Sequence, residues 1–253
     1  MKSLIRAAAF LIMVAVPAGF AHASEPSAGT ASPGYPAGHV VYHASQSGQP
    51  TLDSDAQGGN PFATAFIEAL SQRDASLSEF TTKLGNLTKR HSGGFQSIAV
   101  SPSVLWPDWS VSPSLGTGKR VALVLVISDY SASQSPSLPG ARFDAGRIAL
   151  ALERAGFDTT RALDLDDAKF RAALAAFRIK SADAEAALIY TTGHGVEIDG
   201  RVHLLAGNYP VEKGAAALAQ YGYPLSRISK AANARSVNLI FYAGCRNDPF
   251  LPE

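Results

Sequence analysis

Cysteine is almost absent from this sequence, because Cys245 is the only one among 253 residues. A single thiol cannot form an intramolecular disulfide, which excludes an internally cross-linked scaffold. It also excludes a lipoprotein that would need a cysteine directly after its signal peptide. Cys245 is therefore either an inert buried thiol or a reactive one that serves chemistry.

An excess of charge of either sign is also missing. The chain has 22 Lys and Arg against 21 Asp and Glu, so its formal net charge is +1. Nothing in this balance indicates nucleic acid or an anionic membrane surface as a partner. A composition of 46% hydrophobic and 17% charged residues is typical of a folded globular protein and excludes a disordered one.

Long apolar runs are missing except near the N-terminus. There Lys2 and Arg6 are followed by an unbroken apolar run at residues 7–16 and a small-x-small site at residues 21–23. This order predicts a cleaved signal peptide over residues 1–23 and a periplasmic or secreted location. The alternative, an uncleaved membrane anchor, is disfavoured because the run is shorter than the ~20 residues that a spanning helix needs.

The remaining chain is predicted to form one folded domain behind a flexible leader. Residues 24–38 are rich in Pro, Gly, Ser and Ala and form the leader. A first segment (39–111), a linker (112–119) and a second segment (120–253) follow. Strands are predicted at residues 39–45, 105–111, 121–127, 157–163, 186–192 and 237–242, and a hairpin at 198–202; helices are predicted to begin at residues 61 and 76 and to span 144–155, 166–177 and 225–234. Alternating strands and helices favour an α/β fold with a mostly parallel sheet.

Two chemically suggestive residues directly follow predicted strands. His194, flanked by two glycines, follows the strand at residues 186–192, and Cys245 follows the strand at residues 237–242. Ligands of open α/β sheets bind beyond the carboxyl ends of the strands. An imidazole beside a thiol can act as its base and so generate a nucleophile. Taken singly, each residue could still be structural.

Other candidate sites are weaker. The acidic run Asp164, Asp166 and Asp167 is better explained as a helix cap than as a metal site. The glycines before Lys119 lack the spacing of a phosphate-binding loop. The remaining histidines show no metal-ligand spacing; they are His22, His39, His43, His91 and His203.

Three stretches of the second segment resemble caspase-like and metacaspase-like cysteine peptidases, the bacterial caspase-like domains in particular. They are RVALVLVISDY with LPGARFDAGRIALALERAGFD, then ALIYTTGHGVEIDGRVHLL, and finally NLIFYAGCRNDPF. His194 precedes Cys245 by 51 positions, and about 50 separate the catalytic His and Cys of caspases. The resemblance covers roughly residues 119–250 and implies a caspase-like three-layer sandwich with a mostly parallel six-stranded sheet.

The resemblance also implies roles for the reactive residues. Cys245 would be the nucleophile and His194 the general acid and base. The backbone N–H groups of Gly195 and Cys245 would form the oxyanion hole. A substrate peptide would lie as an added strand along residues 39–45, against Ala44.

Substrate preference is less well defined by the resemblance. Metacaspase-like members hold a Lys or Arg of the substrate with carboxylates, one of which matches Asp144. The position of another, two residues before the cysteine, is occupied here by Ala243. The loss of one carboxylate weakens a pocket that is matched to a positive charge. Cleavage after basic residues is therefore an open expectation.

The order of the segments differs from that of the family. The chain ends eight residues after Cys245, whereas two strands and two helices normally follow the cysteine strand. Those elements are similar to HVVYHASQSGQPTLDSDAQGGNPFATAFIEAL and LSEFTTKLGNLTKRHSGGFQ, which here come first. We therefore expect a circular permutant. The alternative is that residues 39–111 belong to a truncated upstream domain.

Two functions remain open at this level. The first is an active endopeptidase that acts on peptide or protein substrates through an acyl-enzyme. The second is a catalytically weak binding or regulatory module with the caspase fold. No cofactor is expected; the resemblance allows calcium dependence, but no calcium site and no oligomeric state can be assigned from the sequence.

Overall fold

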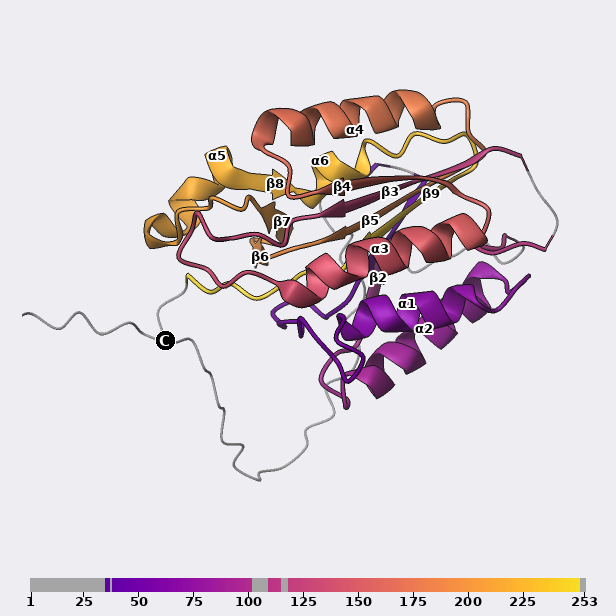
Figure 1. The fold of residues 1–253 in the computed structure, drawn as a ribbon, viewed down its shortest axis with the longest axis horizontal. Coiled ribbons are helices and arrows are strands. Elements are labelled where there is room, and N and C mark those ends of the chain that lie inside the picture. Colours follow the sequence, from indigo (N-terminus) through magenta and orange to yellow (C-terminus); the bar gives the residue numbers. More distant parts are fainter. Residues whose placement is uncertain (1–34, 37, 102–108, 115–117, 251–253) are drawn as a thin grey trace, which may run out of the picture. The chain divides into compact units, whose positions relative to one another are not determined.

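The computed structural model describes residues 35–36, 38–101, 109–114 and 118–250. Over these residues the centre is a six-stranded sheet in the order β2-β1-β9-β5-β3-β4, in which only β2 runs antiparallel to its neighbour (Figure 1). Its strands are β1 (His39–His43), β2 (Ala99–Ser101), β3 (Arg120–Val126), β4 (Asp158–Leu163), β5 (Ala186–Thr192) and β9 (Val237–Tyr242). The expected mostly parallel α/β sheet is confirmed.

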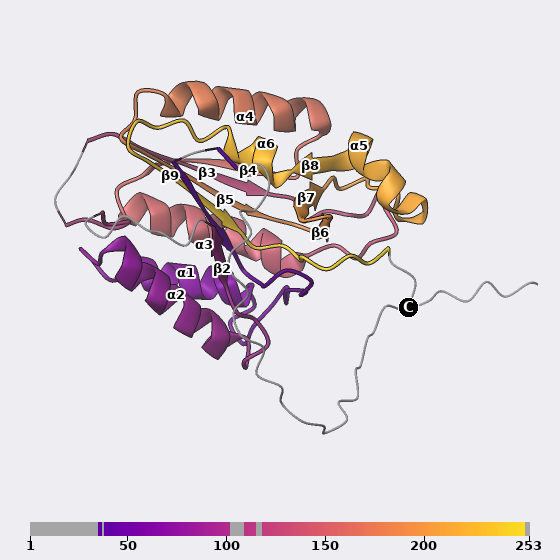
Figure 2. The same cartoon turned by 180° about the vertical axis from the view of Figure 1, so that it is seen from behind.

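Helices cover both faces of this sheet. The helices are α1 (Pro61–Leu70), α2 (Leu77–His91), α3 (Pro139–Arg154), α4 (Asp167–Ser181), the short α5 (Leu218–Tyr221) and α6 (Leu225–Ser229). Val124 of β3 packs with α1, α2 and α3, while its neighbour Leu123 packs with α4 and α6. Figures 1 and 2 show these helices as two layers with the sheet between them. The result is a three-layer sandwich with an apolar core on each side.

Burial explains which residues form the central strands. Every residue of β3, β5 and β9 is buried, as their continuous apolar sequences predict. The edge strand β4 is instead mostly exposed before Ala162, with only Thr159 partly buried. The inner strands therefore fix a rigid base from which the loops at the carboxyl edge project.

Capping residues define several helix starts as the sequence predicts. Asn60 caps α1 by accepting the Phe62 N–H, and Ser76 forms a capping box with Glu79 at the start of α2. The predicted helix at residues 144–155 is wrong at its start, because α3 already begins at Pro139. Proline is favoured in the first turn of a helix, so the earlier start is consistent with helix chemistry.

Other element boundaries also differ from the prediction. Helix α4 continues to Ser181, whereas α6 already ends at Ser229 rather than at residue 234. The predicted hairpin is confirmed as β6 (Gly195–Ile198) and β7 (Arg201–Leu205), and β8 (Gly222–Pro224) extends it to a small sheet. The strand β8 and a 3-10 helix η1 (Val211–Ala217) were not predicted.

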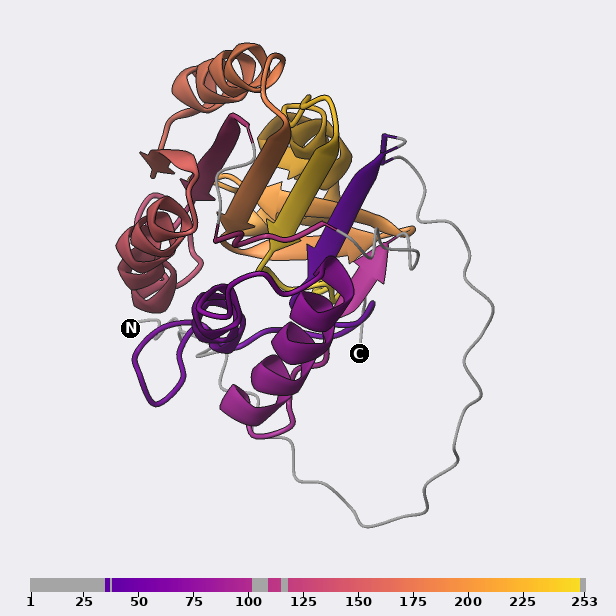
Figure 3. The ribbon, with the colours of Figure 1, turned by 90° about the vertical axis from the view of Figure 1, so that its right-hand side faces the viewer.

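The first segment of the chain completes the large sheet. β1 pairs in parallel with β9, with Val41 opposite Ile240, and β2 pairs with the other side of β1. Figure 3 shows the indigo strand β1 beside the yellow strand β9. Of the strand predicted at residues 105–111, residues 105–108 lie outside the described residues, and Ser110 forms only an isolated bridge with Ser76.

Several predictions concern residues that the structure does not describe. The signal peptide (1–23), most of the leader (24–38) and residues 115–117 of the linker lie outside the described residues. Within the described part of the chain, no helix combines the length and the apolar character needed to cross a membrane.

Candidate active site

The two reactive residues lie beyond neighbouring parallel strands. β5 pairs with β9, and Thr191 lies opposite Tyr242 at the end of this pairing. His194 and Cys245 each follow their member of that pair by three positions. Two hydrogen bonds hold the strand ends together, from the Ala243 N–H to the Thr191 carbonyl (2.9 Å) and from the Thr192 hydroxyl to the Ala243 carbonyl (3.0 Å). The sheet therefore brings both motifs to one edge.

A buried tyrosine holds the His194 loop. The Tyr130 hydroxyl accepts the His194 backbone N–H at 2.8 Å and donates to the Leu205 carbonyl at 3.1 Å. The two rings meet edge to face with centroids 4.4 Å apart, and Tyr130 has no exposed surface. This residue was not predicted from the sequence, although it stands directly after the β3 region.

A second buried tyrosine holds the Cys245 loop. The Tyr242 hydroxyl donates to the Cys245 carbonyl at 3.1 Å. A Cβ atom added to Gly195 would collide with this hydroxyl, and one added to Gly244 would lie only 2.5 Å from it. Glycine is therefore required at both positions because the tyrosine occupies the space that a side chain needs.

The tautomer of His194 follows from its hydrogen bond. Nε2 lies 2.8 Å from the Pro136 carbonyl oxygen, which can only accept, so Nε2 carries the proton in this contact. Nδ1 then keeps the lone pair of the neutral ring. Burial lowers the pKa of His194 below 6.5, and the Pro136 carbonyl and the Asp53 carboxylate oppose this shift. A neutral imidazole is the form that can act as a base.

The thiol of Cys245 contacts a different residue. Its Sγ accepts the Thr51 N–H at 3.3 Å and lies 3.5 Å from the Thr51 hydroxyl. Among the described residues, no hydrogen bond joins the His194 ring to Sγ. The two predicted reactive groups thus share one edge of the sheet without a direct hydrogen bond between them.

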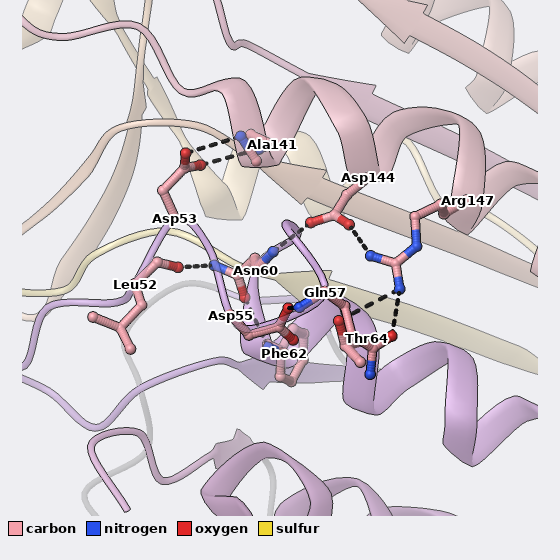
Figure 4. A network of polar contacts seen from close by, with 11 residues as sticks. Leu52, Asp53, Asp55, Gln57, Asn60, Phe62, Thr64, Ala141, Asp144 and Arg147 are labelled. Carbon is pink, nitrogen blue, oxygen red and sulfur yellow. Dashed lines mark hydrogen bonds and ion pairs between the residues drawn. The ribbon is translucent and has the colours of Figure 1, made fainter. Parts of the chain in front are cut away.

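Residues 51–60 form a loop between these groups and α3, here named the 51–60 loop. Its Asp53 carboxylate accepts the N–H groups of Gly140 (2.9 Å) and Ala141 (3.0 Å) in the first turn of α3. At its other end, the Asn60 N–H donates to the Asp144 carboxylate at 2.7 Å. Figure 4 shows both contacts. Two carboxylates therefore fasten this loop, and with it Thr51, to α3.

Asp144, which the resemblance places beside a basic residue of the substrate, is buried and bonded inside the fold. The residue has no exposed surface, and its second oxygen is paired with Arg147 at 2.9 Å. Burial raises the pKa of Asp144 to about 7, although the Asn60 N–H and Arg147 oppose this shift. The Arg147 guanidinium also reaches Gln57 and Thr64 (Figure 4). A positive charge from the chain itself therefore already occupies the Asp144 carboxylate.

The other two residues predicted to contact substrate are buried as well. Ala44 has no exposed surface and Ala243 only 2%. The Ala44 N–H donates to the Tyr242 carbonyl at 2.9 Å, and the Gln96 side chain donates to the Ala44 carbonyl at 3.2 Å. Both backbone groups of Ala44 are thus used inside the fold, and the role of Ala44 and Ala243 in substrate binding stays a prediction.

A buried ion pair fixes the backbone that follows the thiol. Arg246 Nε lies 2.6 Å from a Glu197 oxygen, and both side chains are only 8% exposed. The Arg246 guanidinium also donates to the Ser45 carbonyl at 3.1 Å, and the Ser47 hydroxyl donates to Glu197 at 2.8 Å. The pair therefore connects the Cys245 loop to β6 and to the segment that follows β1.

Comparison with known proteins gives a match to a family model over most of the second segment. The family model described as the caspase domain matches residues 119–241. This stretch includes His194, Tyr130 and Asp144 and ends four positions before Cys245. A search of the curated proteins found no match to the chain. Within the described residues, no group of three or more His, Cys, Asp or Glu side chains is placed to hold a metal ion.

Proposed function

We propose that this chain, whose residues 119–241 match the model of the caspase-domain family, is a cysteine endopeptidase with Cys245 as nucleophile and His194 as general acid and base. One observation carries the proposal: the two residues follow paired positions of β5 and β9 by the same three steps. An imidazole and a thiol that project from adjacent parallel strands face a common edge, where α/β enzymes bind their substrates.

In the proposed reaction, Nδ1 of His194 accepts the thiol proton while Sγ bonds to the carbonyl carbon of the scissile peptide. The N–H groups of Gly195 and Cys245 donate to the oxygen that becomes negatively charged. His194 then gives the proton to the leaving amine as the C–N bond breaks, which leaves an acyl-enzyme. Water hydrolyses this thioester and restores the thiol.

The proposal includes a movement of the thiol. Sγ contacts Thr51 in the structure, so the Cys245 side chain must turn toward His194 when substrate binds. Catalytic hydrogen bonds are often long or misaligned in enzymes without substrate and form only in the complex. The Tyr130 and Tyr242 contacts hold both backbones, so the proposed movement is one of the Cys245 side chain and not of the two loops.

The selectivity for basic residues that the resemblance implies lacks support from Asp144. Its carboxylate is buried and paired with Arg147, and a further cation would have to displace that guanidinium. We therefore propose that cleavage does not depend on Lys or Arg beside the scissile bond.

We further propose that the chain is a circular permutant of the family's domain. The resemblance implies the strand order 2-1-3-4-5-6 with an antiparallel last strand. The observed order β4-β3-β5-β9-β1-β2, with β2 antiparallel, agrees with that order if β1 and β2 are counted last. The connection that the family cuts during activation is then already open. The intact recombinant chain should be active without internal cleavage, as checked by mass spectrometry after turnover.

A second candidate function is a binding module with the caspase fold. The contact of Thr51 with Sγ and the occupied Asp144 favour it. One set of assays separates the two functions. Fluorogenic peptides with Arg, Lys, Asp or Ala at the cleaved position are incubated with the wild type and with Cys245→Ala, His194→Ala and the remote control His91→Ala.

The peptidase proposal predicts turnover by the wild type and by the His91 variant and none by the other two variants. A thiol-directed inhibitor should label the wild type and not Cys245→Ala. Absence of both turnover and labelling refutes the peptidase and favours the binding module. Turnover only with Arg and Lys peptides would instead show that Asp144 is available to substrate.

Export remains a proposal that rests on residues 1–23. A positive start, an apolar run and a small-residue site are the features of a cleaved signal peptide. N-terminal sequencing of the chain recovered from outside the cytoplasm of a bacterial host should give a start near Ser24. Recovery of chain that starts at Met1 contradicts this.

A further inference from the structure

A hollow between α4 and α6 gathers positive charge away from the proposed active site. Its volume is about 290 Å³, and we name it the α4–α6 groove. The side chains that line it are Arg171, Leu174, Ala175, Arg178, Arg227, Lys230 and Ala231. The two helices cover the face of the sheet opposite to α1, α2 and α3 (Figures 1 and 2).

Among the described residues, only Arg171 of the four cations in this groove has an ion-pair partner, and that partner, Asp167, also interacts electrostatically with Arg227. Arg171 pairs with Asp167 at 2.8 Å. The side chains of Arg178, Arg227 and Lys230 form no ion pair with any residue in the described part of the chain. The whole chain has a formal net charge of only +1, so the positive charge around the groove is a local concentration and not a property of the whole surface. Like charges around one hollow repel each other, and a bound anion relieves that repulsion.

The spacing of the cations suits an extended chain. Arg171 and Arg178 are separated by seven residues of α4, which is about 10 Å along the helix. Arg227 lies on α6, and Lys230, three positions further along the chain, is the residue that caps its C-terminal end. A strand that rises ~3.3 Å per residue would cross this distance in three or four residues. Two acidic side chains on such a segment could each approach cations from both helices.

Apolar side chains line the groove together with the cations, and they favour a peptide over other anions as its ligand. Leu174, Ala175 and Ala231 lie in the groove, and Ile179 on α4 is 78% exposed. Inorganic phosphate gains nothing from such apolar surface. A duplex or a bilayer presents a broad surface, whereas the groove is concave. We propose that the α4–α6 groove binds a short acidic peptide segment, with apolar residues between its carboxylates, from a partner protein.

The test measures binding of a labelled peptide by fluorescence anisotropy. The probe has the sequence Glu-Ser-Leu-Ser-Glu, in which an extended chain presents both Glu and the Leu on one face, and its matched control replaces each Glu with Gln. The full chain is compared with Arg178→Gln/Lys230→Gln and with Lys89→Gln/Lys213→Gln, which removes two exposed cations elsewhere. Thermal melts check that all three proteins fold, and mass spectrometry checks that the peptide stays intact.

If the α4–α6 groove binds acidic peptides, the Glu probe binds to the wild type and the Gln control does not. The groove variant should bind about tenfold more weakly, because two ion pairs of modest energy are lost, and the matched variant should equal the wild type. Affinity should fall as salt is added. Equal binding by both variants, equal binding of both peptides, or no binding overturns the proposal. Preferential capture by phosphatidylglycerol vesicles or by duplex DNA overturns it in favour of those surfaces. None of these outcomes depends on peptidase activity.

Discussion

Replacing Tyr130 with Phe tests whether the buried hydroxyl positions His194. The change removes one oxygen that serves two backbone groups, the His194 N–H at 2.8 Å and the Leu205 carbonyl at 3.1 Å. The ring itself has no exposed surface, so water cannot readily replace the hydroxyl. Each group left without a partner costs about 1–3 kcal/mol, so the two groups together give roughly 2–6 kcal/mol of lost stability.

Two assays follow this variant. Urea unfolding gives the free energy of unfolding, and fluorogenic peptide hydrolysis gives kcat and KM separately. Since the His194 backbone loses its support, we expect kcat to fall at least tenfold while KM changes little. The matched control is Tyr209→Phe, which removes a buried hydroxyl that donates only to the Gly214 carbonyl at 2.7 Å. It should lower stability by about 1 kcal/mol and leave kcat unchanged.

The reasoning about Tyr130 is refuted if its variant loses stability but keeps its kcat. The tyrosine would then be structural only, like Tyr209. It is also refuted if both variants lose kcat in proportion to their stability, because that result reports partial unfolding. An inactive wild type would instead refute the proposed peptidase and leave the predicted loss of stability open to its own test.

Three further predictions concern charged groups. Burial lowers the pKa of His194 and the Asp53 carboxylate opposes this, so Asp53→Asn should move the acid limb of the kcat/KM–pH profile to lower pH; a shift to higher pH contradicts it. Burial raises the pKa of Asp144 from 3.8 to about 7 in the folded protein, so folding favours the neutral carboxyl. The stability that this neutral carboxyl contributes is therefore lost as the pH rises from about 4 to 7. Urea titrations of Asp144→Asn at different pH values should not show this loss. Glu197→Ala leaves Arg246 buried without its carboxylate and should cost about 3–5 kcal/mol, and the double variant with Arg246→Ala should cost less than the sum of both single changes.

Sequence patterns identified the elements whose signals are local. Continuous apolar runs marked β3, β5 and β9, and side-chain caps marked the starts of α1 and α2. The start of α3 was misplaced because Asp144 was treated as a terminal residue, whereas Pro139 opens the helix and Asp144 lies inside it. Strands β2 and β8 have three residues each, which is too short for a periodic pattern to emerge.

From the sequence, only those residues of the candidate site that directly follow a predicted strand could be located. The strand-end rule located His194 and Cys245. The contact of Thr51 with Cys245 joins residues 194 positions apart, and that of Tyr130 with His194 spans 64 positions. No local pattern contains such contacts. The pairing of Asp144 with Arg147 is different, because residues three apart on a helix are neighbours; that spacing was readable in the sequence and was missed.

The pairing of β1 with β9 has a consequence for the order of events during synthesis. β1 begins at residue 39, and its partner β9 ends at residue 242. β1 can pair with β2, which ends at Ser101, long before its parallel partner β9 has been synthesised, and contacts of such large sequence separation slow folding. Thr51 and Cys245 come together only after β9 has been synthesised. The proposed nucleophile follows β9, the last of the described strands in chain order, so a chain interrupted before β9 holds no assembled site that could cut its neighbours.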